Sequence, residues 1–255
     1  ATSATGAASY GLYIFTVAAA SSFTLTKVDA SSSASEGVVL SSISGSAISV
    51  GGTSTVVGAT RGLLAQSFAS SSLTVTFTSI TGGTTYGLFA LNFDGSSALA
   101  VSDSTLGSAS TTGVYVYLWP AAGGTAAFTD CVVSSPGFGM HFEALTGTAV
   151  AMTNVAATST GSGFPAIFVV NVGAGSSFAM TKVDATSIGG ASSKGMVLSA
   201  ISGSTIATSG LCTFVGAKVG LHATAFTASS LTIAQSTATG GTDEGLLAND
   251  FDGSS

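Results

Sequence analysis

The sequence predicts an all-β protein, a single-stranded, right-handed parallel β-helix solenoid of about ten coils with about 25 residues each. Two observations carry this prediction. A glycine followed by an apolar residue recurs every 25 to 29 residues, with Ala166 in its place once, and six positions later every coil has an apolar residue. Because each repeat of a solenoid contacts only its neighbours, we expect residues 1–255 to form one continuous unit.

The glycine column also places the strands of each coil. With the glycine as position 1, positions 2 and 4 are mostly apolar, as in Leu63 and Ala65, which is the period-two alternation of a strand. A second strand is predicted at the SLTV and SFTL segments and a shorter third one near 55–57 or 212–214, with TGGTT and DGSS as turns. The apolar ladder expected inside the coils is position 7: Val17, Ile43, Phe68, Phe93, Trp119, Leu145, Val172, Ile201, Phe226 and Phe251.

The sequence also contains a longer repeat that comprises several of these coils. SSFTLTKVDA begins at Ser21 and SSFAMTKVDA at Ser176, whereas GVVLSSISGS begins at Gly37 and GMVLSAISGS at Gly195. The two matching segments of the second pair are three residues farther apart in the sequence than those of the first pair. We therefore expect an outer loop between Asp184 and Gly195 that accepts insertions. Six coils make a unit of about 155 residues, which gives one unit over 1–155 and part of a second over 156–255.

The composition restricts the possible partners. Charged residues are only 6% of the chain, against about 25% in ordinary domains, while the chain has 43 Ser, 35 Thr and 34 Gly. These hydroxyls are potential acceptors of O-linked sugars, and no asparagine begins an Asn-x-Ser/Thr sequon. A net charge of -6 with five Lys and Arg argues against nucleic acid as a partner.

Other repeat folds fit less well. Leucine-rich and ankyrin repeats need a leucine ladder or helices, and a β-propeller, the structural alternative, needs blades of about 40 residues. The succession GLLAQSF, SSLTV and TGGT resembles right-handed parallel β-helix proteins of the pectin-lyase-like type. The low-charge coils are also similar to very large repetitive surface proteins of protozoa and to bacterial surface adhesins. These resemblances imply the fold and a surface, filament or polysaccharide-related function.

The search for chemistry gives no catalytic, cofactor-binding or metal-binding residue. Pectin-degrading β-helices use carboxylates and basic groups on neighbouring coils, and the best carboxylate pair here is Asp103 with Asp130. The register places none of the five Lys and Arg beside this pair, which favours a solvated turn. His141 and His222 fall at outward position 3 without a cluster of further ligands, so we expect neither zinc nor an enzyme.

The two cysteines and the apolar segments give simple predictions. Cys131 and Cys212 lie three coils apart, about 14 Å along the axis, so both should be free and buried. The chain has no uninterrupted run of 18 apolar residues, so no membrane-spanning helix is expected. The apolar segment 11–20 has no preceding basic residue and recurs in related form from Ala166, unlike a signal peptide.

The most informative surface is an outward stripe at positions 3 and 5. Exposed apolar stripes usually mark contact surfaces, although a covering loop or harmless isolated exposure is the alternative. Lateral packing, if it occurs, should use Phe89, Tyr115, Tyr117 and Phe168. The whole predicted stripe is Tyr13, Phe15, Phe89, Leu91, Tyr115, Tyr117, Phe168 and Val170.

We therefore expect a structural protein that forms an extracellular fibre, appendage or surface coat. Residues 1–9 align with 156–164 of an internal coil, and FDGSS at the end matches an internal motif, so both ends should stack on further coils. An adhesin or carbohydrate-binding surface protein is the first alternative. A β-helix polysaccharide lyase or hydrolase is the second.

Overall fold

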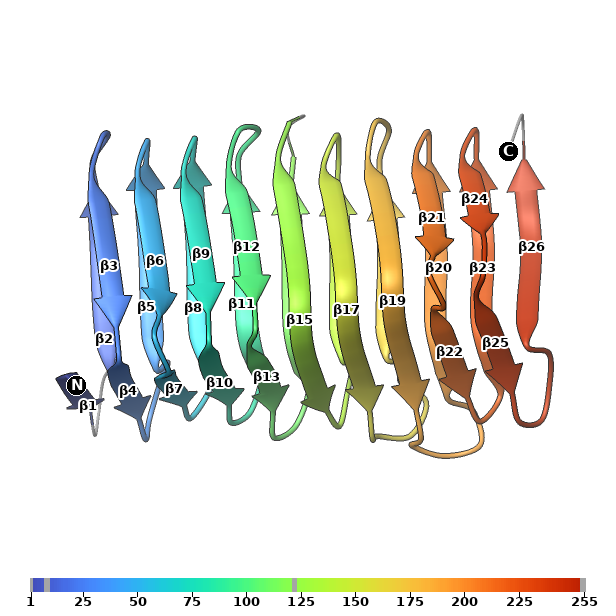
Figure 1. Cartoon of the computed structure of the whole chain (residues 1–255), viewed down its shortest axis with the longest axis horizontal. Coiled ribbons are helices and arrows are strands. Elements are labelled where there is room, and N and C mark those ends of the chain that lie inside the picture. Colours follow the sequence, from blue (N-terminus) through green and yellow to red (C-terminus); the bar gives the residue numbers. More distant parts are fainter. Residues whose placement is uncertain (1, 7–9, 121–122, 253–255) are drawn as a thin grey trace.

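The computed structural model describes residues 2–6, 10–120 and 123–252, and in them the chain forms a right-handed parallel β-solenoid of about nine turns (Figure 1). All paired strands are parallel, and each pairs with strands of the coils before and after it. The described residues form no helix, so none meets the length and apolarity needed to cross a membrane. The predicted fold is confirmed.

One sheet has ten strands, one from each coil, and begins each coil after the glycine. We call it the first sheet. Its order follows the chain without interruption from one end of the solenoid to the other. Its strands are β2 (Leu12–Val17), β5 (Val38–Ser44), β8 (Leu63–Ala69), β11 (Tyr86–Phe93), β14 (Thr112–Trp119), β16 (Met140–Leu145), β18 (Ile167–Val172), β20 (Lys194–Ser202), β23 (Val219–Thr227) and β26 (Leu246–Asp252).

The second sheet has sixteen strands and contains the predicted second and third strands of each coil. In three consecutive coils these two strands are continuous, which the sequence pattern does not anticipate: β15 (Thr125–Ser135), β17 (Ala149–Ser159) and β19 (Ser177–Ser187). The others are β1 (Thr2–Gly6), β3 (Ser22–Thr26), β4 (Val28–Ser32), β6 (Ala47–Gly51), β7 (Ser54–Gly58), β9 (Ser72–Thr76), β10 (Thr78–Gly82), β12 (Ala98–Ser102), β13 (Thr105–Ser108), β21 (Thr205–Ser209), β22 (Thr213–Gly216), β24 (Ser230–Ile233) and β25 (Thr237–Gly240).

The predicted ladder at position 7 forms the core. Its residues pair in register between coils, and the rings of Phe68 and Phe93 stack with their centroids 4.5 Å apart. From Ile43 to Phe226 every member is buried. Val17 is half-buried and Phe251 is 41% exposed, because each has a neighbouring coil on one side only among the described residues. The ladder is thus confirmed for the eight inner coils.

A left-handed residue at position 6 explains why position 7 points inward. Positions 2 and 4 face the core, so strict alternation would place position 7 outside. In every coil, however, position 6 has a positive φ of 54° to 58°, which breaks the alternation and turns the next side chain back into the core. These residues are Thr16, Ser42, Ser67, Asn92, Leu118, Ala144, Asn171, Ala200, Ala225 and Asp250.

The glycine column reflects close approach of the backbone. A Cβ added at Gly37 would lie 2.7 Å from the carbonyl oxygen of Val57 and 2.9 Å from that of Gly62 in the next coil. Both distances are far inside van der Waals contact, so this corner accepts a side chain only where the coils shift. The column therefore marks where the start of each coil packs against its neighbours.

Buried hydroxyls line the corner between the two sheets. Ser97 Oγ accepts a hydrogen bond from the backbone N–H of Ser71 at 3.2 Å and donates to the carbonyl of Phe68 at 3.0 Å. The same pattern recurs at Ser71 and Ser229, so the hydroxyls satisfy backbone groups that the turn leaves unpaired. Part of the high serine content is therefore structural and inaccessible to glycosylation.

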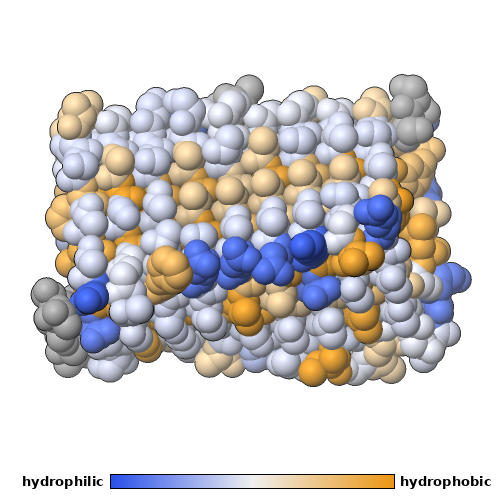
Figure 2. Space-filling view, viewed as in Figure 1, coloured by the Kyte–Doolittle hydropathy of each residue, from blue (hydrophilic) through white to orange (hydrophobic). Residues whose placement is uncertain are grey.

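The other corner of the coil carries exposed polar residues in the left-handed conformation. Asp103, Asp130, Asn154 and Lys182 all have φ between 49° and 54° and lie exposed on successive coils. Figure 2 shows a row of hydrophilic side chains crossing successive coils below a face of small, mostly pale residues. This corner is solvated as predicted, but only Asp103 lies between two strands, whereas Asp130, Asn154 and Lys182 lie inside β15, β17 and β19.

Two smaller predictions are also confirmed. Cys131 and Cys212 are free and buried. The segment between Asp184 and Gly195 contains an outer loop in which Ile188 is 66% exposed. The prediction of uncapped ends rests partly on residues 1, 7–9 and 253–255, which lie outside the described residues.

Candidate functional site

The outer face of the first sheet carries a continuous group of aromatic side chains. We call this group the aromatic row; it extends over the coils that contain β11, β14, β16 and β18. Neighbouring rings in it have centroids 4.5 to 5.6 Å apart. Some pairs lie within one strand, as do Tyr115 and Tyr117, and others are brought together by the register between adjacent coils. Its members are Tyr86, Phe89, Tyr115, Tyr117, Phe138, His141, Phe164 and Phe168.

The predicted outward stripe is correct in direction, and Tyr13 and Phe15 are exposed as expected, but the middle of the stripe is less exposed than predicted. Phe89 is buried, with only 9% of its surface exposed, and Tyr115, Tyr117 and Phe168 are half-buried. Stacking along the row causes this, since the Phe89 ring lies between Arg61, whose Cζ is 5.4 Å from its centroid, and Tyr115 at 5.2 Å. Phe89 therefore offers little surface for lateral packing.

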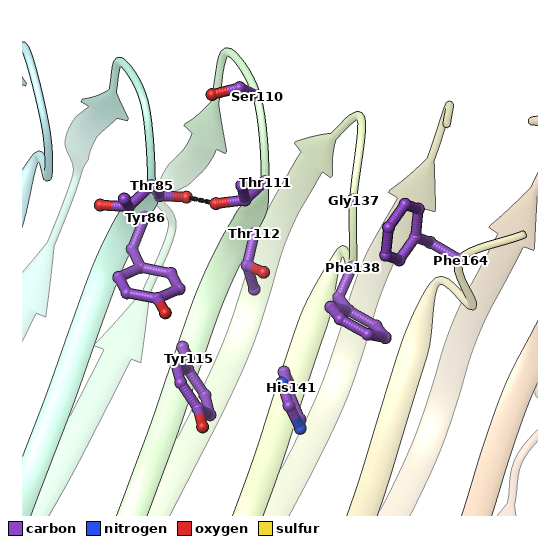
Figure 3. Close-up of a pocket in the computed structure, with 10 residues that line it drawn as sticks. All are labelled: Thr85, Tyr86, Ser110, Thr111, Thr112, Tyr115, Gly137, Phe138, His141 and Phe164. Carbon is purple, nitrogen blue, oxygen red and sulfur yellow. Dashed lines mark hydrogen bonds between the residues drawn. The ribbon is translucent and has the colours of Figure 1, made fainter. Parts of the chain in front are cut away.

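A hollow opens in the row where a small residue lies between two aromatic ones. Tyr86, Thr112 and Phe138 each precede the position-1 glycine of consecutive coils, and Tyr86 and Thr112 are register partners. Figure 3 shows the rings of Tyr86 and Phe138 on either side of Thr112, with Tyr115 and His141 below. The cavity has a volume of about 330 Å³.

Both aromatic walls of this hollow are supported from behind. Arg61 Cζ lies 6.0 Å from the Tyr86 ring, and Arg61 is itself held by Glu36 at 2.6 Å. On the other side, Phe138 stacks on Phe168 at 5.3 Å. The walls are therefore fixed by packing in the protein alone, which reduces the entropy lost when a ligand binds.

Hydroxyl groups form the rim and base of the hollow. Thr111 Oγ1 donates to the carbonyl of Thr85, and Ser110 Oγ donates to the carbonyl of Thr84 at 2.8 Å. The hydroxyls of Thr112 and Tyr86 make no hydrogen bond to another described residue. Thr112 is buried, with only 3% of its surface exposed, so the half-buried Tyr86 hydroxyl is the one of the two that can reach a ligand as donor and acceptor.

The groups below the hollow are uncharged or paired. Tyr115 Oη donates to Glu143 Oε2 at 2.5 Å, and burial together with this bond raises the pKa of the tyrosine. Burial lowers the pKa of His141 to about 4, although Glu143, 3.5 Å from its Nε2, opposes the shift. His141 is thus neutral at pH 7, and its enclosed Nε2 has no hydrogen-bond partner among the described residues.

A second hollow of about 430 Å³ adjoins the first one, sharing Phe138 and Phe164 with it. It contains Lys194 and His222, whose Nζ and Nδ1 atoms are 2.9 Å apart. Burial, and then the nearby Lys218, lowers the pKa of Lys194, while burial and Lys194 lower that of His222. The row thus passes from a neutral hollow to a basic one.

The predicted carboxylate pair lies at the opposite corner of the coil. Asp103 and Asp130 follow the register partners Ser102 and Thr129, so they occupy equivalent places on adjacent coils, as expected. Asp130 accepts a hydrogen bond from Asn154. Asp130 and Asn154 line a shallow hollow together with Lys182, a cation that the sequence pattern does not place beside the pair. Among the residues that the structure describes, no group of three or more potential metal ligands is found.

Sequence reasoning misses most of the first hollow, since of its lining only Tyr115 and His141 belong to the outward positions. Tyr86, Thr112 and Phe138 precede the glycine, and Phe164 lies in a turn, so none belongs to positions 3 and 5. The signal was present as a column before the glycine in which aromatic residues flank a threonine. No protein-family model, curated protein or solved structure matches the chain, so the class of protein, a β-solenoid repeat protein, rests on the fold itself.

Proposed function

We propose that this chain is a structural repeat protein, a rod-like part of an extracellular fibre, appendage or surface coat. The supporting observation is the unbroken parallel pairing of the first sheet from β2 to β26, with one strand from every coil. A solenoid of this kind adds length by adding coils, each stabilised by its neighbours. Axial growth by stacking of further coils is part of the proposal.

The surface supports a role outside the cell. The face in Figure 2 is mostly pale or weakly hydrophobic, with strongly hydrophilic residues gathered mainly in one row, and charged residues are only 6% of the chain. We propose that O-linked sugars on exposed hydroxyls keep such rods apart, because parallel stacked strands with few charges otherwise aggregate. Buried hydroxyls such as Ser71 and Ser97 are excluded as acceptors by their burial.

Electron microscopy of the protein isolated from its natural source tests the structural function. Long unbranched particles with an axial repeat near 4.8 Å are expected, that spacing being the distance between paired strands. Compact particles without this repeat would contradict the proposal. In the same material, an intact mass equal to that of the bare polypeptide would exclude glycosylation.

The two alternatives differ in their support. An adhesin needs a ligand site on the rod, and the hollow between Tyr86 and Phe138 offers one. A lyase or hydrolase needs an acid–base arrangement, and the Asp103–Asp130 corner is exposed, with a left-handed backbone at both carboxylates. We therefore propose a protein without catalytic activity, and release of sugar products from polysaccharides by the purified chain would contradict this.

A further inference from the structure

The hollow between Tyr86 and Phe138 has the width of one intercalated ring. Paired strands are about 4.8 Å apart, so two residues that are two coils apart are separated by about 9.6 Å. Van der Waals contact needs about 4 Å on each side of a guest ring, or about 8 Å in total. In the coil between them Thr112 is too short to fill this space, and its side chain lies at the base in Figure 3.

The chemistry of the lining defines the guest. The ten lining residues include no Asp, Glu, Lys or Arg. Arg61 and Glu143, which contact the lining, are paired with Glu36 and Tyr115, and Lys194 lies in the adjoining hollow. An uncharged lining does not compensate the desolvation of an ionic group, so it favours a neutral guest. Aromatic walls with a hydroxyl-lined base suit a molecule that has both an apolar C–H face and hydroxyl groups.

We propose that this hollow binds one neutral pyranose ring of a glycan. The ring packs between Tyr86 and Phe138 above the buried Thr112, and its hydroxyls form a hydrogen bond with Tyr86 Oη. The exposed hydroxyls of Ser110 and Thr111 lie at the rim, where the neighbouring sugar leaves the hollow. This site is independent of fibre formation, since a rod that does not polymerise still carries it.

The test uses the purified chain with three neutral hexasaccharides, cellohexaose, xylohexaose and mannohexaose, and with hexagalacturonate as the acidic comparison. Calorimetry and saturation-transfer NMR should detect binding of at least one neutral sugar and weaker or no binding of the acidic one. Tyr86→Ala should weaken binding by about tenfold or more, because it removes one stacking wall.

Two further variants separate the site from general stability. Thr112→Phe places a third ring between Tyr86 and Phe138, so it should abolish binding while the protein stays folded, whereas Thr112→Ser should retain binding. Ile188→Ala, on an exposed loop outside the hollow, should bind like the parent. The proposal fails if no neutral hexasaccharide binds, if Thr112→Phe binds as tightly as the parent, or if hexagalacturonate binds more tightly than the neutral sugars.

Discussion

Two rows of side chains on the first sheet behave differently although both run through every coil. The inner row at position 7 is apolar in all ten coils, and its eight inner members are buried. The outer row at position 3 varies from valine to histidine, and its burial ranges from Val39 at 2% exposed to Tyr13 at 50%. In the inner row the core determines burial, whereas in the outer row the neighbouring coils determine it.

This difference teaches that direction and burial are separate properties in a solenoid. Phe89 points outward and is nevertheless buried, because the rings on adjacent coils and Arg61 cover it. A substitution in the inner row should therefore affect the core directly. A substitution in the outer row should depend on which side chains flank it.

The largest effect is expected in the inner row. Replacing Trp119 or Phe93 by alanine removes a fully buried ring and should lower the free energy of unfolding by about 3 to 5 kcal/mol. Phe15→Ala, at the outward position 5 and 59% exposed, should change it by about 0.5 kcal/mol or less. Denaturant titration measures both, and equal effects of the two substitutions would show that the inward register is wrong.

A pH effect is expected from His141 in the outer row. Its pKa is lowered to about 4, so the unfolded chain binds the proton more readily and stability should fall as pH drops from about 6.5 towards 4. Over this range the loss amounts to roughly 3 kcal/mol at most. His141→Phe keeps a ring between Tyr115 and Phe168 and should show a smaller loss in the free energy of unfolding. An unchanged pH dependence would show that His141 is not held neutral.

One coil couples the core to the hydroxyl corner. Where neighbouring coils have Ser97 and Thr148, Gly124 lies against Trp119, and a Cβ there would be 2.0 Å from the indole Nε1. Gly124→Ser should therefore cost about 1 to 3 kcal/mol through overpacking. Adding Trp119→Phe reproduces the Phe93 and Ser97 pair of the preceding coil and should recover part of this loss. Additive losses in the double variant would contradict the coupling.

The smallest effect is expected from a glycine substitution at the left-handed position 6. Ala225 has a φ of 56°, whereas Ala223, two residues earlier in β23, is buried in the regular part of the strand. Ala225→Gly should be nearly neutral, because relief of left-handed strain offsets the greater freedom of the unfolded chain. Ala223→Gly should cost about 1 kcal/mol. Thermal unfolding of both variants measures the two losses of stability. A larger loss for Ala225→Gly than for Ala223→Gly would contradict this prediction.

The sequence is sufficient to predict the coils, the inner ladder and the outer loop near Ile188, because each depends on a column that repeats with the coil. It does not reveal that Phe89 is covered, since burial of an outward ring depends on the neighbours that register brings beside it. The hollow is missed for a related reason. Thr112 becomes the base of a site only because Tyr86 and Phe138 flank it in adjacent coils.

Distances between spin labels test the stacked solenoid most directly. Ser49, Ala151, Ala179 and Ala207 occupy one register column of the second sheet, on β6, β17, β19 and β21. With one label at position 49 and the other at 151, 179 or 207, the pairs are four, five and six coils apart. Pulsed electron paramagnetic resonance should give distances near 19, 24 and 29 Å, rising by about 4.8 Å per coil. Distances that do not increase steadily with coil number would contradict the solenoid.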